Sequence, residues 1–325
     1  MRQQAPESNQ PKSARRWSLI VAGVFAGLVA AAAATIKGDL PLEELRARYA
    51  PAPSKFIELG GMSVHYRDEG SGPPLVLLHG TGASLHTWEG WVSALRRDFR
   101  MVRMDLPGFG LTGPNPSGDY TSAAYVEFLE SFAARLGLDR FDLGGNSLGG
   151  FLAWRYAFEH PERVRKLILV DAAGYPQSRP PVLVFRLARI PVLSSLLAHV
   201  DPRRFAEKTL RQAYADPARA TPQLVQQYAD LALRPGNRQA FVARVSAPER
   251  DRSAQIRGLR LPTLVLWGRQ DELLAVDNAD RFGRDIPGSR VIIYDGVGHV
   301  PMEEIAERSA ADARAFLLQS ESVRR

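Results

Sequence analysis

The sequence predicts a doubly wound, mostly parallel α/β sheet that carries an inserted helical cap and follows an N-terminal transmembrane helix. Six short apolar runs alternate with helical stretches, a pattern typical of parallel strands covered on both faces by helices. About 90 residues between the fourth and fifth runs contain no strand pattern. The third observation is an uncharged, apolar run of 20 residues near the N-terminus.

That apolar run, residues 17–36, follows a basic tail of residues 1–16 that includes Lys12, Arg15 and Arg16. A helix of 20 residues is about 30 Å long, which is enough to cross a bilayer. Basic residues before the span predict a cytoplasmic N-terminus and place the rest of the chain on the other side of the membrane. The alanines at 30–34 offer an alternative, cleavage of a signal peptide and secretion. Residues 37–54 are predicted to be a linker.

The strands and helices of the predicted core occupy residues 55–171 and 261–325, and the predicted helical cap occupies residues 172–260. A hairpin at 56–59 and 64–67 turns at two glycines. The parallel strands are predicted at 75–78, 101–104, 141–143, 167–170, 263–267 and 291–294, and helices at 122–136, 148–158, 275–284 and 303–318. Cap helices are predicted at 182–198, 202–214, 222–233 and 237–245. Such a cap would cover the carboxyl edge of the sheet, where open α/β sheets bind ligands.

Charge and cysteine content exclude several classes of chemistry. The net charge is +7, and residues 172–260 alone carry +9, from 14 Arg and one Lys against six acids. This excess indicates either a solvated basic surface or docking of anionic lipid or substrate. No nucleic-acid-binding signature accompanies it, so we expect no nucleic-acid partner. The chain has no Cys, which excludes disulfides, thiolate metal sites and a cysteine nucleophile.

A candidate nucleophile lies in the pentapeptide Gly145-Asn146-Ser147-Leu148-Gly149, which follows a predicted strand and opens a predicted helix. In this context a G-x-S-x-G pattern predicts a sharp turn that exposes a serine hydroxyl. The flanking glycines avoid a clash in the turn, and the helix N-terminus favours negative charge.

Serine is a weak nucleophile, so it requires a neighbouring base and a carboxylate that orients the base. His299 follows the last strand in a glycine-rich loop and is the candidate base. Asp271, just after the preceding strand, is the candidate acid; Asp171 is its rival, and Glu272 and Asp277 are nearby solvated alternatives.

A glycine-rich turn, His79-Gly80-Thr81-Gly82, follows the first parallel strand. It can direct the Thr81 N–H at a substrate oxygen, with the Leu148 N–H as the second donor of an oxyanion hole. Asp105 also ends a strand, but its Asp-Leu-Pro-Gly-Phe-Gly context favours a structural role in a turn.

Residues 55–318 resemble the α/β-hydrolase superfamily through HGTG at 79–82, DLPGFG at 105–110, GNSLGG at 145–150, GRQD at 268–271 and GVGH at 296–299. The resemblance implies attack by Ser147 on a carbonyl, an oxyanion held by Thr81 and Leu148, and an acyl-enzyme hydrolysed by water through His299. It implies no cofactor and no metal.

Within this superfamily the sequence favours a serine hydrolase acting on small-molecule or lipid carboxylic esters. Ser147 argues against dehalogenases and epoxide hydrolases, which carry aspartate at the elbow. A C–C bond hydrolase of ring-cleavage products remains an alternative, although Val300 replaces the Trp of members of that group, and so does a serine perhydrolase or haloperoxidase. A receptor without catalysis is a further alternative. The stretch 182–197 is expected to form an acyl pocket and, with Arg186 and Arg189, could instead rest on a lipid surface.

Overall fold

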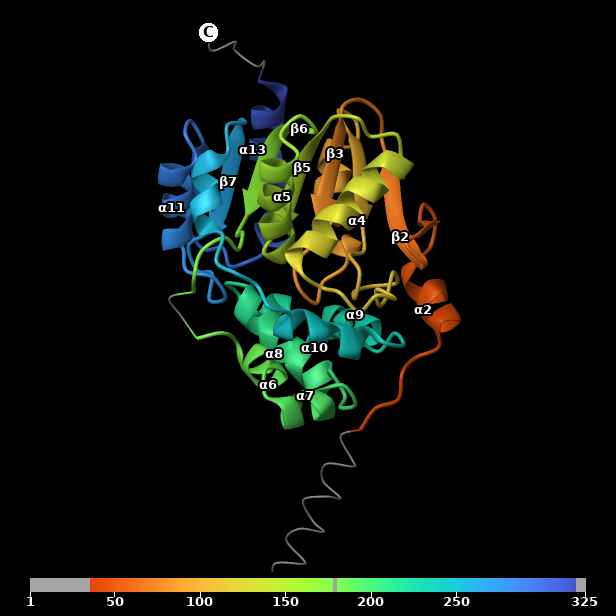
Figure 1. The fold of residues 1–325 in the computed structure, drawn as a ribbon. Coiled ribbons are helices and arrows are strands. Elements are labelled where there is room, and N and C mark those ends of the chain that lie inside the picture. Colours follow the sequence, from red (N-terminus) through yellow and green to blue (C-terminus); the bar gives the residue numbers. More distant parts are fainter. Residues whose placement is uncertain (1–35, 178–179, 320–325) are drawn as a thin grey trace, which may run out of the picture.

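The computed structural model describes residues 36–177 and 180–319, which form an eight-stranded sheet in the order β1-β2-β4-β3-β5-β6-β7-β8 (Figure 1). The pairs β1–β2 and β2–β4 are antiparallel and all other neighbours are parallel. The mostly parallel α/β sheet predicted from the sequence is therefore confirmed. The strands are β1 (Lys55–Leu59), β2 (Met62–Glu69), β3 (Pro74–Leu78), β4 (Arg100–Met104), β5 (Phe141–Asn146), β6 (Val164–Val170), β7 (Thr263–Gly268) and β8 (Arg290–Tyr294).

Helices cover both faces of the sheet because alternate residues of each strand enter different cores. In β3, Val76 and Leu78 pack in one apolar cluster with the helices α4, α5 and α11, whereas Leu75 and Leu77 pack in another with α3 and α13. All four side chains are fully buried. The helices of this core are α3 (Glu89–Leu95), α4 (Ser122–Arg135), α5 (Leu148–Glu159), α11 (Asp277–Asp285), α12 (Pro301–Glu304) and α13 (Ala306–Leu318), with the 3₁₀ helix η1 (Leu85–Trp88).

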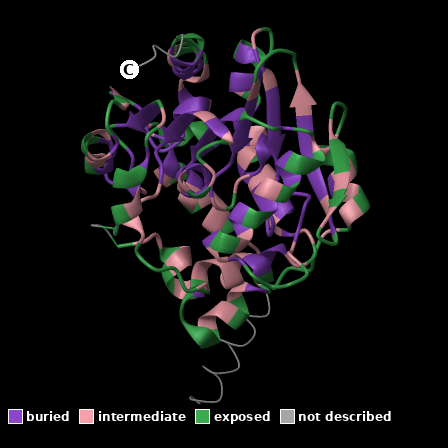
Figure 2. Ribbon diagram, turned by 45° about the horizontal axis from the view of Figure 1, so that its top comes forward, coloured by how far each residue is buried: buried purple, intermediate pink, exposed green. Residues whose placement is uncertain are grey.

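Between β6 and β7 the chain leaves the sheet and forms a helical layer, here called the cap, that lies beneath the sheet in Figure 1. Figure 2 shows that buried residues concentrate in the sheet and its flanking helices, whereas the lowest helices are mostly intermediate or exposed. The helices of this segment are α6 (Leu183–Ala188), α7 (Pro191–Leu197), α8 (Arg203–Ala213), η2 (Pro217–Arg219), α9 (Pro222–Ala232), α10 (Asn237–Ser246) and η3 (Ser253–Gly258).

One predicted cap helix, 182–198, is two short helices. Pro191 stands at the first position of α7 and cannot donate a backbone hydrogen bond to the preceding turn, so the helical ladder breaks at Ile190. A similar break at Ile305 separates α12 from α13 inside the predicted helix 303–318.

The segment predicted as a linker, residues 37–54, is packed onto the domain. It contains helix α2 (Leu42–Tyr49), whose Leu45 is fully buried against Leu111 and Leu231. At the start of the segment the Leu40 N–H donates to the Leu233 carbonyl oxygen (2.8 Å). Its prolines and charges suggested a spacer, but one apolar face is enough to dock it.

The predicted transmembrane run, residues 17–36, lies outside the described residues except for Ile36. No helix within residues 36–177 and 180–319 has the length and apolar character needed to cross a bilayer.

Candidate active site

Ser147 occupies a strained turn between β5 and α5. Its φ and ψ are 54° and −113°, and it is one of two residues other than glycine that have positive φ in the described chain. The turn is held from both sides, because the Ser147 N–H donates to the Val170 carbonyl oxygen (3.1 Å) while its own carbonyl accepts from Phe151 (3.0 Å) and Ala173 (3.1 Å). Such a turn presents the hydroxyl at the carboxyl edge of the sheet.

The glycines around Ser147 are required by close backbone contacts. A Cβ atom on Gly145 would lie 2.2 Å from the Gly149 carbonyl oxygen, and one on Gly149 would lie 2.2 Å from that of Leu78. These contacts bring the start of α5 against the end of β3. The Leu148 N–H lies in the first turn of α5, where helix amides lack an intrahelical partner and favour negative charge.

His299 and Asp271 form a direct hydrogen-bonded pair. The His299 Nδ1 and Asp271 Oδ2 atoms are 2.7 Å apart, and both residues are buried. The other carboxylate oxygen, Oδ1, accepts the backbone N–H groups of Leu273 (2.7 Å) and Leu274 (2.9 Å). A carboxylate so placed accepts from Nδ1–H, which leaves Nε2 with the lone pair that a general base requires.

Asp171, the rival acid, lies beside this pair and also has positive φ (42°). One carboxyl oxygen accepts the Gly268 N–H (2.9 Å). Burial, followed by the negative charge of Asp271, raises the pKa of Asp171 well above its usual range. Asp271 is the aspartate that binds His299, whereas Asp171 binds the Gly268 backbone, so the geometry assigns the two aspartates different roles.

The loop that carries His299 is fixed by three contacts. The His299 N–H donates to the Ala213 carbonyl oxygen (2.6 Å), and the Asn146 side-chain amide donates to the His299 carbonyl oxygen (3.0 Å). The Glu304 carboxylate accepts the Gly298 N–H (2.7 Å). Asn146 thus links the turn that holds Ser147 to the loop that holds His299.

His79 holds the glycine-rich turn that precedes Thr81. It is fully buried; its Nε2 accepts the Leu106 N–H (2.9 Å) and its Nδ1 is 2.8 Å from the Gly80 carbonyl oxygen, to which it donates. Burial lowers the pKa of His79, so the neutral ring supplies one acceptor and one donor. A Cβ on Gly80 would lie 3.2 Å from the Ser147 Cβ, which places this turn directly against the elbow.

Asp105, the other aspartate at a strand end, serves the architecture of a neighbouring turn. Its buried carboxylate accepts the backbone N–H groups of Leu85 and Leu111, each at 2.8 Å, and lies 2.7 Å from the His65 Nδ1. Burial raises the pKa of Asp105, but the neighbouring histidines His65, His79 and His86 together lower it below its usual range.

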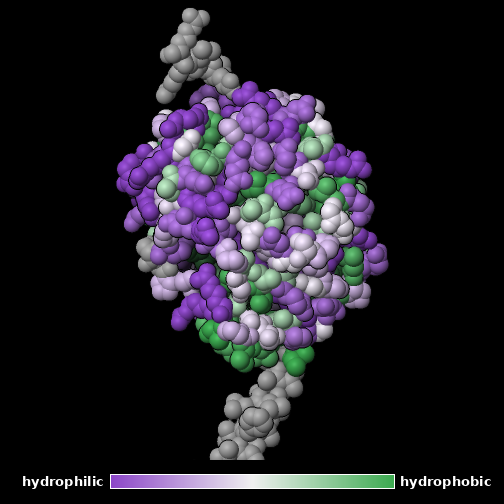
Figure 3. Space-filling model, viewed as in Figure 1, coloured by the Kyte–Doolittle hydropathy of each residue, from purple (hydrophilic) through white to green (hydrophobic). Residues whose placement is uncertain are grey.

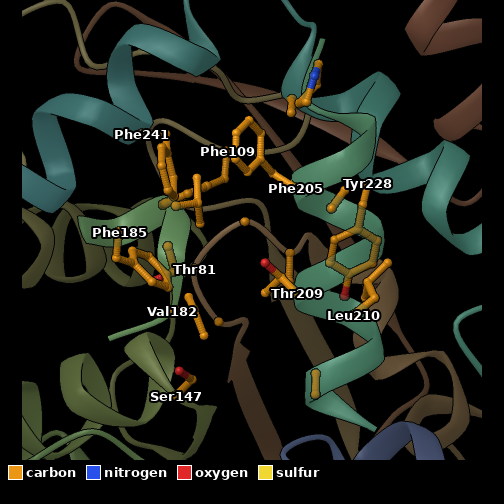
Figure 4. A pocket seen from close by; sticks show the side chains of 18 of the residues that line it. Thr81, Phe109, Ser147, Val182, Phe185, Phe205, Thr209, Leu210, Tyr228 and Phe241 are labelled. Atoms are coloured by element: carbon orange, nitrogen blue, oxygen red, sulfur yellow. The ribbon is translucent and has the colours of Figure 1, made fainter. Parts of the chain in front are cut away.

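A cavity of about 360 Å³ lies between the sheet edge and the cap and is lined by Ser147, His299 and Thr81. Figure 4 shows Ser147 at one end, with Val182, Phe185 and Phe241 on one side and Thr209, Leu210 and Tyr228 on the other. The walls are mainly apolar. Other lining residues include Phe109, Val184, Leu197, Val200, Phe205, Leu231, Leu273 and Val300.

Asp171, Asp271 and His299 are also the one group of side chains in the described chain whose arrangement could ligate a metal ion. Their ligand atoms lie within 4.8 Å of one another. The contact of 2.7 Å between Nδ1 and Oδ2 is a hydrogen bond, and a cation would have to replace its proton. The geometry therefore fits an oriented histidine better than a metal centre.

The structure brings Ser147, His299 and Thr81 to one cavity and places Asp271 directly behind His299. His79, Gly80, Gly145, Asn146 and Leu148 surround them. Glu304, which accepts a hydrogen bond from the histidine loop, was not predicted from the sequence, and neither were the cap residues Thr209 and Tyr228 in the cavity wall. No motif marks these residues, because they meet the site through tertiary packing alone.

A family model described as the alpha/beta hydrolase fold matches residues 73–305. The chain belongs to the α/β-hydrolase family. It is 28% identical over 255 residues to a 2-hydroxy-6-oxo-2,4-heptadienoate hydrolase of Pseudomonas putida, covering 75% of this chain and 89% of that protein.

Two solved structures of similar proteins are named for enzymes that act on lipids. A putative lipase of Acinetobacter baumannii matches with a TM-score of 0.72 and 26% identity, covering 87% of this chain and 97% of that one. A bacterial membrane phospholipase A matches with a TM-score of 0.68 and 26% identity, covering 94% of this chain and 98% of that one. The relatives thus include enzymes named for two kinds of bond cleavage.

Proposed function

We propose that this hydrolase cleaves carboxylic esters with aliphatic acyl chains, using Ser147 as nucleophile, His299 as base and Asp271 as the orienting acid. The observation that carries the proposal is that Ser147 and His299 line one apolar cavity while Asp271 is bonded to the Nδ1 of His299. The strained turn at Ser147 supports a nucleophilic role, because such strain is retained where function requires an exposed side chain.

In the first half of the reaction, Ser147 Oγ attacks the ester carbonyl carbon while His299 Nε2 takes the hydroxyl proton. The negative charge on the carbonyl oxygen is stabilised by the backbone N–H groups of Thr81 and Leu148. Collapse breaks the bond to the alcohol oxygen, which receives the proton from His299. The products are the free alcohol and an acyl ester of Ser147.

In the second half, water attacks the acyl carbon and gives a proton to His299 Nε2. The tetrahedral intermediate uses the same two N–H donors and collapses to the carboxylic acid and the Ser147 hydroxyl, which recovers its proton from His299. Asp271 accepts the hydrogen bond from His299 Nδ1 throughout and stabilises the imidazolium. Burial and the negative charge of Asp271 raise the pKa of the neighbouring Asp171, which disfavours a second negative charge there.

The cavity walls support an aliphatic acyl group. Phe185, Phe241 and Leu210 present apolar surface, and burial of each methylene of a chain contributes about 0.8 kcal/mol. Arg238 also lines the cavity, but its guanidinium already donates to the Lys37 carbonyl oxygen (2.7 Å) and to the Asp39 carboxylate (2.7 Å). The Nε of Arg238 has no hydrogen-bond partner among the described residues, and Arg189 also lines the cavity.

The second candidate is cleavage of a C–C bond in a ring-cleavage product, which the similarity to the Pseudomonas putida hydrolase supports. Both reactions use an oriented histidine and an oxyanion site, so the geometry around Ser147 fits either. The mainly apolar wall of the cavity favours the ester, whereas Arg189 and Arg238, which also line it, would suit the anion named for the relative.

We also propose that residues 17–36 anchor the protein in a membrane, with the hydrolase on the non-cytoplasmic side. The uncharged sequence of this run supports the anchor, and so does similarity to a membrane phospholipase over 94% of the chain. The intact mass of the native protein tests it: an uncleaved chain in the membrane fraction is expected, whereas a mature chain lacking this run indicates secretion.

The activity is tested by hydrolysis of p-nitrophenyl esters from acetate to palmitate, with Ser147→Ala as the matched control. We expect turnover with an optimum at intermediate or long chains, and none above background in the variant. Turnover of a ring-cleavage dienone acid without ester hydrolysis would favour the second candidate, and peroxide-dependent halide oxidation would indicate a perhydrolase. No turnover and no fluorophosphonate labelling would contradict a serine hydrolase and favour a receptor.

A further inference from the structure

We infer that the outer face of α6 and α7, together with Ile36, is a docking surface for an anionic lipid bilayer. This face is called the cap face below. Seven large apolar residues are exposed in the described chain, and five of them belong to it. They are Ile36, Leu183, Ile190, Val192 and Leu196.

The exposure of these residues is substantial and is concentrated at one pole of the molecule. Val192 is 80% exposed and Ile36 is 57% exposed. Figure 3 shows apolar atoms gathered at the lower pole, where Figure 1 places α6 and α7. Helix α7 buries none of its residues, so the domain's own core does not explain why it is rich in leucine and valine.

The charge around the cap face complements an anionic surface. Residues 172–200 contain three arginines and no acidic residue. Of these, Arg186 and Arg189 are exposed on and next to α6, and Lys37 is exposed beside Ile36. Apolar side chains flanked by arginine and lysine are the pattern of helices that lie in the interface of a membrane.

The apolar run of the N-terminus ends on this same face. Ile36 is the last residue of the run, and it pairs with Val200 in an isolated antiparallel bridge. The Lys37 N–H donates to the His199 carbonyl oxygen (2.9 Å). A chain that leaves a bilayer at residue 36 is therefore bound to the cap at once, with no spacer between them.

Arg238 of α10 connects the segment that follows Ile36 to the cap through hydrogen bonds. Its guanidinium donates to the carbonyl oxygens of Lys37 (2.7 Å) and Val200 (3.0 Å) and to the Asp39 carboxylate (2.7 Å). Arg238 is nearly buried, so these bonds are shielded from water. The position of residue 36 relative to α7 is thereby fixed, and an anchor at residues 17–36 would hold the cap face against the bilayer.

The cap face and the cavity are opposite sides of the same short helices. Val184 and Phe185 of α6 and Leu197 of α7 line the cavity, whereas Leu183, Val192 and Leu196 of the same helices are exposed. Docking would place the cavity directly above the lipid. This relation bears on the proposed lipid-ester activity, but the docking itself does not depend on that activity.

The chain has no cysteine, so single labels test the docking in the full-length protein. Val192→Cys places a fluorescent environment-sensitive label on the cap face, and Leu318→Cys places the same label on an exposed apolar residue at the end of α13, on the opposite side of the domain in Figure 1. Each variant is reconstituted into vesicles of phosphatidylcholine with or without phosphatidylglycerol, containing a nitroxide-labelled lipid.

We expect the emission at position 192 to shift to the blue and to be quenched by the lipid nitroxide, more strongly with phosphatidylglycerol. The label at 318 should show neither effect. A label at 192 that stays in water in membrane-bound protein would overturn the inference. So would a blue shift that grows with protein density but is not quenched by lipid, because a second copy would then cover the face.

A functional variant separates docking from catalysis. Neither Val192 nor Leu196 lines the cavity, and the double change Val192→Glu and Leu196→Glu removes two inserted apolar side chains. We expect hydrolysis of lipid esters in vesicles to fall about tenfold or more, with turnover of soluble p-nitrophenyl acetate unchanged. Equal rates on vesicles would contradict docking. If the wild type hydrolyses no ester at all, the proposed activity fails while the label measurement still tests the surface.

Discussion

The sheet and the cap contain similar apolar side chains but bury them to different extents. In β3, four consecutive apolar residues are fully buried, and the strand ends beside the turn that carries Ser147. In α7, apolar residues of the same kinds remain exposed, and none is buried. In the sheet, buried apolar residues hold the strand that ends beside Ser147. In the cap, some apolar residues line the cavity and others are exposed on the outer surface. Substitutions in the two regions should therefore have different consequences.

The largest effect is expected at the sheet edge from Ser147→Ala. Removal of a triad nucleophile lowers kcat by about 10⁶-fold in other serine hydrolases, and a comparable loss is expected here. Folding should be unchanged, because the Ser147 backbone makes the contacts that hold the turn. Steady-state rates and circular dichroism on the same preparation measure both. Residual activity close to that of the wild type would remove Ser147 from the mechanism.

Substitution of the two neighbouring buried aspartates, Asp271 and Asp171, should lower kcat by very different amounts. Asp271→Asn changes the atom that accepts from His299 Nδ1 and is expected to lower kcat by about 10⁴-fold. Asp171→Asn should lower kcat by less than about tenfold, since Asp171 does not bind His299 and an amide has the same shape and keeps an oxygen that can accept the Gly268 N–H. Comparison of kcat for the two variants measures the difference, and equal losses would show that the assignment of Asp271 as the residue that orients His299 is wrong.

Substitutions in the sheet should lower the free energy of unfolding more than substitutions on the cap face. Leu77→Ala removes a fully buried side chain from β3 and should lower the free energy of unfolding by about 2–5 kcal/mol. Val192→Ala on the cap face should change it by less than about 0.5 kcal/mol. Urea titration of both variants provides the comparison. A large destabilisation by Val192→Ala would mean that α7 packs more tightly than its exposure indicates.

The smallest effect on rate is expected in the cavity wall. Phe185 of α6 packs near Phe241, with ring centroids 5.6 Å apart, and both line the cavity. Phe185→Ala should move the preferred acyl chain to greater length while changing kcat on p-nitrophenyl acetate by less than about threefold. The measurement is kcat/KM across the ester series. An unchanged chain-length profile would place the acyl group elsewhere in the cavity.

The sequence predicted the sheet more completely than the cap, and the reason is physical. Strands such as 75–78 and 263–267 are buried on both faces and therefore appear as continuous apolar runs bounded by glycines and polar residues. In the cap, the predicted helix 182–198 is broken at Pro191, and residues 37–54 contain a docked helix where a linker was expected. Short amphipathic segments acquire their positions from tertiary contacts that local sequence does not encode.

The same distinction holds for the candidate site. Ser147, His299 and Thr81 could be located because turns rich in glycine mark the ends of strands. The sequence favoured Asp271 over Asp171 as the acid, although both follow a strand, and the hydrogen bond between Asp271 and His299 supports that choice. Glu304 and Tyr228 belong to no local sequence motif. They reach the site only through the tertiary structure, in which Glu304 binds the histidine loop and Tyr228 lines the cavity.

The central claim is that Ser147 carries the acyl group during turnover. Intact-protein and peptide mass spectrometry of the enzyme, quenched with acid during hydrolysis of a p-nitrophenyl ester, tests it most directly. We expect an adduct with the mass of the acyl group on the peptide that contains Ser147, and no adduct in Ser147→Ala. Ester turnover that persists undiminished in Ser147→Ala, or an adduct on a different residue, would contradict it.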